Sequence, residues 1–215
     1  EGKRTQGEKK RREWFKLMPG ILSTRINPST WENDQFFDPS DIYNQIVEMY
    51  SKKHELSEEE VRDMVDRIAY HESKLDPSSV QRLSDNSPGK GRGLFQFEVG
   101  EYAGAETAIQ RFKNYFRQHD PSLANINIPE DFSTIPGDMQ RSLFLINLMA
   151  TENRPREESD VRANLASAKE KGKRGLEDLW INYHWKGYKV DPDSISARRS
   201  SFQRDMADYD RIYKK

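Results

Sequence analysis

Most of the chain carries apolar residues three and four positions apart, which predicts amphipathic helices. Asp38 and Pro39 mark the start of one helix, because aspartate caps a helix N-terminus and proline suits the first helical position. Ser57 and Glu60 form the S-x-x-E capping box of the next helix. Other helices are predicted over residues 105–116, 138–152, 157–171 and 176–183, and a last one, capped by Ser194, over 195–213. With no strand pattern and no internal repeat, the predicted fold class is mainly α.

The stretch between the second and third of these helices has a different composition. Residues 77–95 are rich in Ser, Pro, Gly, Asp and Asn, which predicts a loop. We expect Asp76-Pro77 to end the preceding helix, because proline disfavours helical geometry in the residue before it. The glycines of "GKGRG" at 89–93 allow tight turns or close backbone approach. This stretch does not match the phosphate-binding pattern G-x-x-x-x-G-K-[ST].

Composition and charge narrow the classes of protein that this chain could be. The 215 residues are 34% hydrophobic, 33% charged and 11% aromatic, which predicts a core surrounded by solvated helices or arms. The net charge of −1 gives no overall attraction to nucleic acid or to a membrane surface. There is no cysteine for a disulfide or thiolate metal site, and no apolar run long enough to span a membrane. Because the first residue is Glu1, we expect a processed chain or a piece of a longer one.

One carboxylate stands at a position where the helical pattern calls for an apolar residue. Val61, Val65 and Ile68 share a helix face, and Glu72 follows at the next position of that face. A carboxylate there loses hydration, and the helix C-terminus also disfavours its charge, so that both effects favour the protonated form. A general acid that works near neutral pH needs that property. The alternative is a boundary glutamate that faces solvent beside Lys74.

Other common catalytic patterns are missing. "HES" at 71–73 does not begin a zinc-binding H-E-x-x-H motif, because position 75 is leucine. The four histidines are scattered through the sequence, so we expect neither a metal nor another cofactor. No serine lies in a G-x-S-x-G turn, which removes support for a serine hydrolase.

Three segments together resemble a known family. Glu72-Ser73, the polar loop after Pro77 and "GRGLFQFE" at 91–98 are similar to motifs of the lytic transglycosylases and goose-type lysozymes. That family has a glutamate-serine pair at a helix end, a Gly-Leu-(Met/Phe)-Gln motif, and a later helical Ala-Tyr-Asn-Ala-Gly segment. "NYHWKGY" at 182–188 resembles the last one loosely, in the manner of variants in phage enzymes. His184 stands in place of the family's asparagine, one residue is inserted before Gly187, and Phe95 replaces the commoner methionine.

The resemblance covers about residues 40–190 and implies an organisation and a set of roles. It implies a lysozyme-like helical domain at 37–190. The Lys and Arg residues near the start of the chain predict a basic extended arm at 1–36, and the apolar spacing near its end predicts an extra C-terminal helix at 191–215. Glu72 would protonate the glycosidic oxygen between N-acetylmuramic acid and N-acetylglucosamine, and then act as a base toward the muramic C6 hydroxyl, which closes a 1,6-anhydro ring. The residues expected to bind substrate or to support Glu72 are Ser73, Phe95, Gln96, Tyr183 and His184.

That chemistry needs one carboxyl group, whereas most glycosidases use two. Asp85 or Glu98 could supply a second one, although neither lies in a motif that requires it, so a lysozyme-type hydrolase stays open.

The resemblance also implies partners and a setting. The expected partners are peptidoglycan glycan strands and, through the arm and the C-terminal helix, other virion or envelope-assembly proteins. We expect a phage virion protein that opens the host cell wall during genome entry, or a periplasmic bacterial enzyme. A structural virion protein with a lysozyme-like fold and little activity is the alternative from another class.

Overall fold

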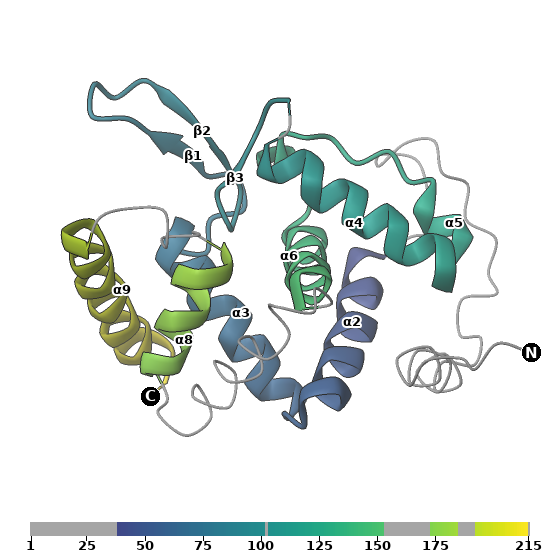
Figure 1. Ribbon diagram of the computed structural model, residues 1–215, viewed down its shortest axis with the longest axis horizontal. Coiled ribbons are helices and arrows are strands. Elements are labelled where there is room, and N and C mark those ends of the chain that lie inside the picture. The colour runs from purple at the N-terminus through teal and green to yellow at the C-terminus, as the bar shows by residue number, and fades with distance from the viewer. Residues whose placement is uncertain (1–37, 102, 153–172, 185–191, 215) are drawn as a thin grey trace, which may run out of the picture. The chain divides into compact units, whose positions relative to one another are not determined.

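The computed structural model describes residues 38–101, 103–152, 173–184 and 192–214 (Figure 1). The predicted basic arm and the predicted helix at 157–171 lie outside these residues. The described chain divides into two compact units. Residues 113–127 belong to one unit, and residues 38–112 and 128–214 belong to the other.

Most described residues are helical, which confirms the predicted class at that level. The helices are α2 (Pro39–His54), α3 (Glu58–Ser73), α4 (Gly104–His119), α5 (Pro121–Ala124), α6 (Gly137–Glu152), α8 (Lys173–Leu179) and α9 (Pro192–Tyr213), with a 3-10 turn η1 (Phe132–Thr134) and a π-helix η2 (Trp180–His184). The strands are β1 (Val80–Arg82), β2 (Pro88–Arg92) and β3 (Phe97–Glu98). Within the described residues, no helix has the length and apolar character that crossing a bilayer requires.

The predicted starts of α2 and α3 are confirmed by the hydrogen bonds of their caps. At α2, the Asp38 carboxylate accepts a hydrogen bond from the Ser40 backbone nitrogen at 2.8 Å. At α3, the Glu60 backbone nitrogen donates to Ser57 Oγ at 3.1 Å, and the Ser57 backbone nitrogen donates to Glu60 Oε2 at 2.7 Å. These bonds satisfy amide groups that have no partner inside the helix, and they set where each helix begins.

Two predicted helix boundaries are wrong. α3 ends at Ser73, ahead of Asp76-Pro77, because Lys74 and Leu75 adopt left-handed backbone with φ of 58° and 66°. The Lys74 backbone nitrogen caps the end by donating to Tyr70 O at 2.9 Å. α9 begins at Pro192, so Ser194 lies inside the helix instead of capping it. Proline at the first position of a helix explains the earlier start.

The prediction of a loop over 77–95 is also wrong in part, because this stretch holds a small antiparallel sheet in the order β1-β2-β3. Val80 pairs with Arg92, and Arg92 pairs in turn with Phe97. The β1–β2 hairpin projects away from the helices (Figure 1). Gln81 supports the hairpin through its side-chain oxygen, which accepts from the backbone nitrogens of Lys90 and Gly91.

The larger unit has an apolar core to which α2, α3, α6 and η2 contribute. α2 packs against α3 and α6, and η2 contacts α6. The largest side chains that are almost completely buried in this unit include Tyr50, Ile68, Phe95, Phe112, Phe132, Leu143, Trp180 and Phe202. α9 packs against α3 and α8, so this helix lies on the core of the unit (Figure 1).

One buried amide joins the sheet segment to α6. Gln140 has no exposed surface. Its oxygen accepts from the Leu94 backbone nitrogen at 2.6 Å, and its nitrogen donates to Pro77 O and Ile135 O, both at 2.9 Å. The sheet segment is therefore tied down on both sides, just after α3 and just before Phe95.

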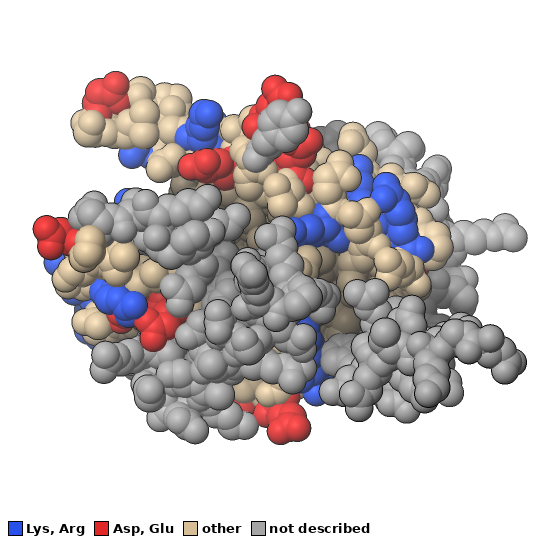
Figure 2. Space-filling model, viewed as in Figure 1, with Lys and Arg blue, Asp and Glu red and all other residues tan. Residues whose placement is uncertain are grey.

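The smaller unit holds the C-terminal part of α4 and the short helix α5. Asp120 caps α5 by accepting from the Ser122 backbone nitrogen at 3.1 Å, and the Tyr115 ring packs against His119. On the face shown in Figure 2, side chains of both charges are interspersed over the described residues, with Lys and Arg gathered over α4.

Candidate active site

Glu72 lies in the last turn of α3, as the sequence predicts, and is mostly buried, with 16% of its side chain exposed. The Trp180 indole nitrogen Nε1 donates to Glu72 Oε1 at 2.5 Å. His184 Nε2 lies 3.6 Å from the same oxygen. A partly exposed carboxylate is thus held at one oxygen by two side chains that are more than a hundred residues away in sequence.

Both of those side chains come from η2, the π-helix at Trp180–His184. Single π-helical turns are rare in proteins, and many of those that occur lie at functional sites. Trp180 is 1% exposed, and its ring stacks on Phe202 with ring centroids 5.3 Å apart. A buried indole needs a partner for its N–H group, and Glu72 supplies it. The side chain of Tyr183, which was predicted to bond near Glu72, lies outside the described part of the chain.

His184 is fixed by a second contact. Its Nε2 lies 2.7 Å from the Phe95 carbonyl oxygen. Because a carbonyl oxygen only accepts, Nε2 carries the hydrogen and donates to Phe95 O. The ring packs edge-on against Phe97 and Phe144, with centroids 5.4 and 5.5 Å away. The "GLFQF" segment and η2 therefore meet directly beside Glu72, although the two predicted motifs are distant in sequence.

The Phe95 side chain, which the sequence predicts to bind substrate, is buried in the core. It has no exposed surface and stacks on Phe144, with centroids 4.2 Å apart and ring planes 7° apart. A side chain without exposed surface cannot line a substrate groove. Phe95 contributes to this site through its backbone carbonyl, which positions His184.

Ser73 and Gln96 lie near the predicted site but point at backbone groups. Ser73 Oγ donates to Ala69 O at 3.0 Å, one turn back in α3. Gln96 has left-handed backbone with φ of 49°, and its amide nitrogen donates to Gly93 O at 2.7 Å. A Cβ on Gly91 would lie 2.8 Å from the Gln96 side-chain oxygen, so glycine at 91 leaves room for this amide. The roles of Ser73 and Gln96 toward a substrate stay predictions.

The two alternative carboxylates lie on the sheet segment. Asp85 is at the exposed turn of the β1–β2 hairpin, where Ser87 donates to it from Oγ at 2.5 Å and from the backbone nitrogen at 3.0 Å. These bonds lower the pKa of the Asp85 carboxyl and mark it as a group that stabilises the turn. Glu98 is exposed at the end of β3. Among the described residues, neither carboxylate has a contact with Glu72.

Sequence reasoning missed two residues of this site, Trp180 and His71. The His71 ring packs against Trp180 at 81°, with centroids 4.4 Å apart, and its Nδ1 lies 2.7 Å from Asp205 Oδ2. Burial lowers the pKa of His71 below its ordinary value, and the charges of Glu72 and Asp205 oppose this effect without reversing it. The ring is therefore neutral at neutral pH, with its hydrogen on Nδ1 facing the carboxylate.

The arrangement suits proton transfer at a single carboxyl group. The contacts of Glu72 with described residues fall on Oε1, so Oε2 is the oxygen that could exchange a proton with a bound molecule. A general acid needs fixed orientation and some exposure, and Glu72 has both. No group of three His, Asp or Glu side chains within the described residues could hold a metal ion.

The chain matches no protein-family model, no curated protein and no solved structure. Any assignment of function therefore depends on the geometry around Glu72 and on the motifs of the sequence.

The buried neutral state of His71 predicts how the stability depends on pH. Since the pKa of His71 is lower in the folded chain than in the unfolded one, the unfolded chain binds the proton more readily. The free energy of unfolding should fall as the pH drops from about 6.5, by at most about 1.4 kcal/mol per pH unit for this group. Urea unfolding of the wild type and His71→Gln over this range measures the effect, and the variant should have the smaller slope.

His119 in the smaller unit provides a second test of the same effect. Burial lowers the pKa of His119 as well, so His119→Gln should also reduce the slope. Independent titration of the two histidines predicts that the two reductions add. Equal slopes for the wild type and His71→Gln would contradict the assignment of a neutral buried His71.

Proposed function

We propose that this chain is a peptidoglycan-cleaving lytic transglycosylase that cuts the bond between N-acetylmuramic acid and N-acetylglucosamine. The observation that carries the proposal is the Glu72 carboxylate, mostly buried at the end of α3 and oriented by Trp180 and His184. The resemblance of "ES" at 72–73 and "GLFQF" at 93–97 to that family supports the same assignment.

In the proposed reaction, protonated Glu72 gives its proton to the glycosidic oxygen as the bond to the muramic C1 breaks. The resulting carboxylate then takes the proton of the muramic C6 hydroxyl, whose oxygen attacks C1 and closes the 1,6-anhydro ring. Glu72 ends the cycle protonated, and no water is consumed. A single carboxyl group is sufficient for this sequence, so the proposed reaction requires neither Asp85 nor Glu98.

His184 and Trp180 have supporting roles in this proposal. The Trp180 N–H fixes Oε1, so that Oε2 keeps one direction toward the substrate. The His184 N–H is anchored on the Phe95 carbonyl and lies close enough to Oε1 to oppose rotation of the carboxylate. The setting in a phage virion that acts on the host cell wall is part of the proposal and derives from the resemblance.

The proposal is tested with purified sacculi that carry a covalently attached dye. Incubation with the purified chain should release soluble dye-labelled fragments, and the heat-denatured chain should release none. Absence of release by a folded chain, with a known lysozyme active on the same sacculi, would contradict an enzyme and favour a structural role.

A further inference from the structure

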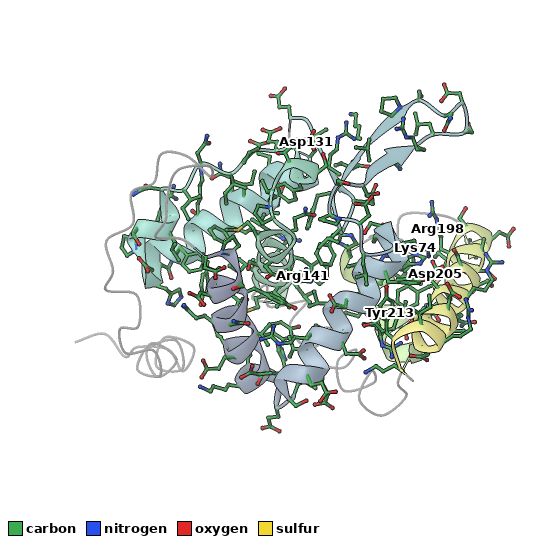
Figure 3. All side chains as sticks on the ribbon, turned by 180° about the vertical axis from the view of Figure 1, so that it is seen from behind. Lys74, Asp131, Arg141, Arg198, Asp205 and Tyr213 are labelled. Carbon is green, nitrogen blue, oxygen red and sulfur yellow. The ribbon has the colours of Figure 1, made fainter. Side chains whose placement is uncertain are left out.

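α3 presents a second polar face, distinct from the face that ends at Glu72. Arg67, Tyr70, His71 and Lys74 recur at spacings of three and four along the helix and all contact α9. Figure 3 shows Lys74 and Asp205 side by side in the seam between α3 and α9. The end of the helix that carries Glu72 is therefore in contact with a helix near the end of the chain.

Three aspartates of α9 form this seam. Asp210 accepts from Arg67 at 2.6 Å, Asp208 accepts from the Tyr70 hydroxyl at 2.5 Å, and Asp205 accepts from His71 at 2.7 Å. The other oxygen of Asp205 is bound by the Lys74 ammonium group. Both oxygens of the Asp205 carboxylate are thus engaged by residues on either side of Glu72.

Of these three contacts, the one made by Asp205 leads to Glu72. The His71 side chain is 7% exposed and lies edge-to-face with Trp180, whose N–H is the donor to Glu72. Rotation of the imidazole would change the surface on which the indole rests. The hydrogen bond to Asp205 opposes that rotation, because it fixes the position of Nδ1.

We propose that Asp205 is a positioning residue for Glu72, acting through His71 and Trp180. This inference rests on the proposed function of Glu72, and it makes α9 part of the site. α9 lies beyond about residues 40–190, the region that resembles the lytic transglycosylases, so the resemblance does not supply this role. Small displacements of a reacting group cost large factors in rate, which gives such a support its effect.

The first test separates positioning from the general docking of α9. Asp205→Ala should lower kcat on soluble glycan strands by at least about 10-fold and up to about 100-fold, with KM changed by no more than about 2-fold, because His71 and Trp180 are buried. Asp208→Ala is the matched control, since it removes another α9–α3 hydrogen bond that does not lead to Glu72. Its kcat should stay within about 2-fold of the wild type.

The second test does not depend on enzymatic activity. The indole N–H resonance of Trp180, assigned by its loss in Trp180→Phe, should move and exchange faster with solvent in Asp205→Ala. It should stay in place in Asp208→Ala. Asp205→Asn keeps an acceptor for His71 and should restore both the resonance and most of kcat.

These outcomes are distinguishable from a failure of the proposed function. If the wild type cleaves glycan and Asp205→Ala keeps its kcat and its Trp180 resonance, the positioning role is overturned while the function stands. If the wild type is inactive, the resonance still decides whether Asp205 fixes Trp180. Equal effects of Asp205→Ala and Asp208→Ala would also overturn the proposal, because they would show a general loss of α9 docking.

Discussion

Glu72→Gln should abolish fragment release from sacculi, with a loss of about 10²–10⁴-fold that is typical of removing a general acid or base. Glutamine has the same shape as glutamate, and its amide oxygen can still accept from the Trp180 N–H. The variant therefore keeps the local packing and loses the proton that the reaction needs. Thermal unfolding of the two proteins, measured beside the activity, should be similar.

The two carboxylates on the sheet segment are the controls for this result. Asp85→Asn and Glu98→Gln should each keep activity within about 3-fold of the wild type, because the proposed reaction uses the Glu72 carboxyl group alone. A large loss in either variant would contradict the single-carboxyl mechanism and indicate a second catalytic group. Full activity of Glu72→Gln would remove Glu72 from the reaction.

Gln140→Leu should be among the most destabilising single changes in the chain. Leucine fills the space but leaves the buried Leu94 N–H and the buried Ile135 carbonyl without their partner, whereas water can reach the carbonyl of the exposed Pro77. Each unpaired buried group costs about 1–3 kcal/mol, so we expect a loss of about 3 kcal/mol or more in the free energy of unfolding. For a chain of this size, that loss corresponds to a decrease in Tm of about 10 °C.

Gln81→Leu is the matched control, because Gln81 also accepts from backbone N–H groups, those of Lys90 and Gly91. Gln81 and Lys90 are exposed, so water can replace the acceptor of the Lys90 N–H, whereas Gly91 is buried. We therefore expect a cost of about 1 kcal/mol. Similar decreases in Tm for the two leucine variants would contradict the role of Gln140 as a buried anchor.

The helices could be predicted because their signals are local. The Asp38 cap and the capping box of Ser57 and Glu60 act within one turn, and the apolar spacing continues along each helix. The sheet escaped because its strands are short, and β2 is rich in glycine and charged residues. Its stability comes partly from Gln81 and Gln140, whose contacts reach across the sequence and leave no local pattern.

In the candidate site too, only the residues that belong to local patterns could be predicted from the sequence. Glu72 is visible as an irregularity in a helical face, and "GLFQF" is visible as a motif. The roles of Trp180, His71 and Asp205 could not be predicted, because the contacts that join them to Glu72 and to one another each link residues more than a hundred positions apart. The sequence offered one chemical indication of these contacts: an indole or imidazole that is buried requires a hydrogen-bond partner.

Mass spectrometry of the glycan ends released from peptidoglycan, by the wild type and by Glu72→Gln in parallel, tests the central claim most directly. We expect 1,6-anhydromuramic ends from the wild type and none from the variant. Reducing muramic ends from the wild type would contradict the transglycosylase reaction and point to a hydrolase. Anhydro ends from Glu72→Gln at the wild-type rate would show that Glu72 is not the acid and base.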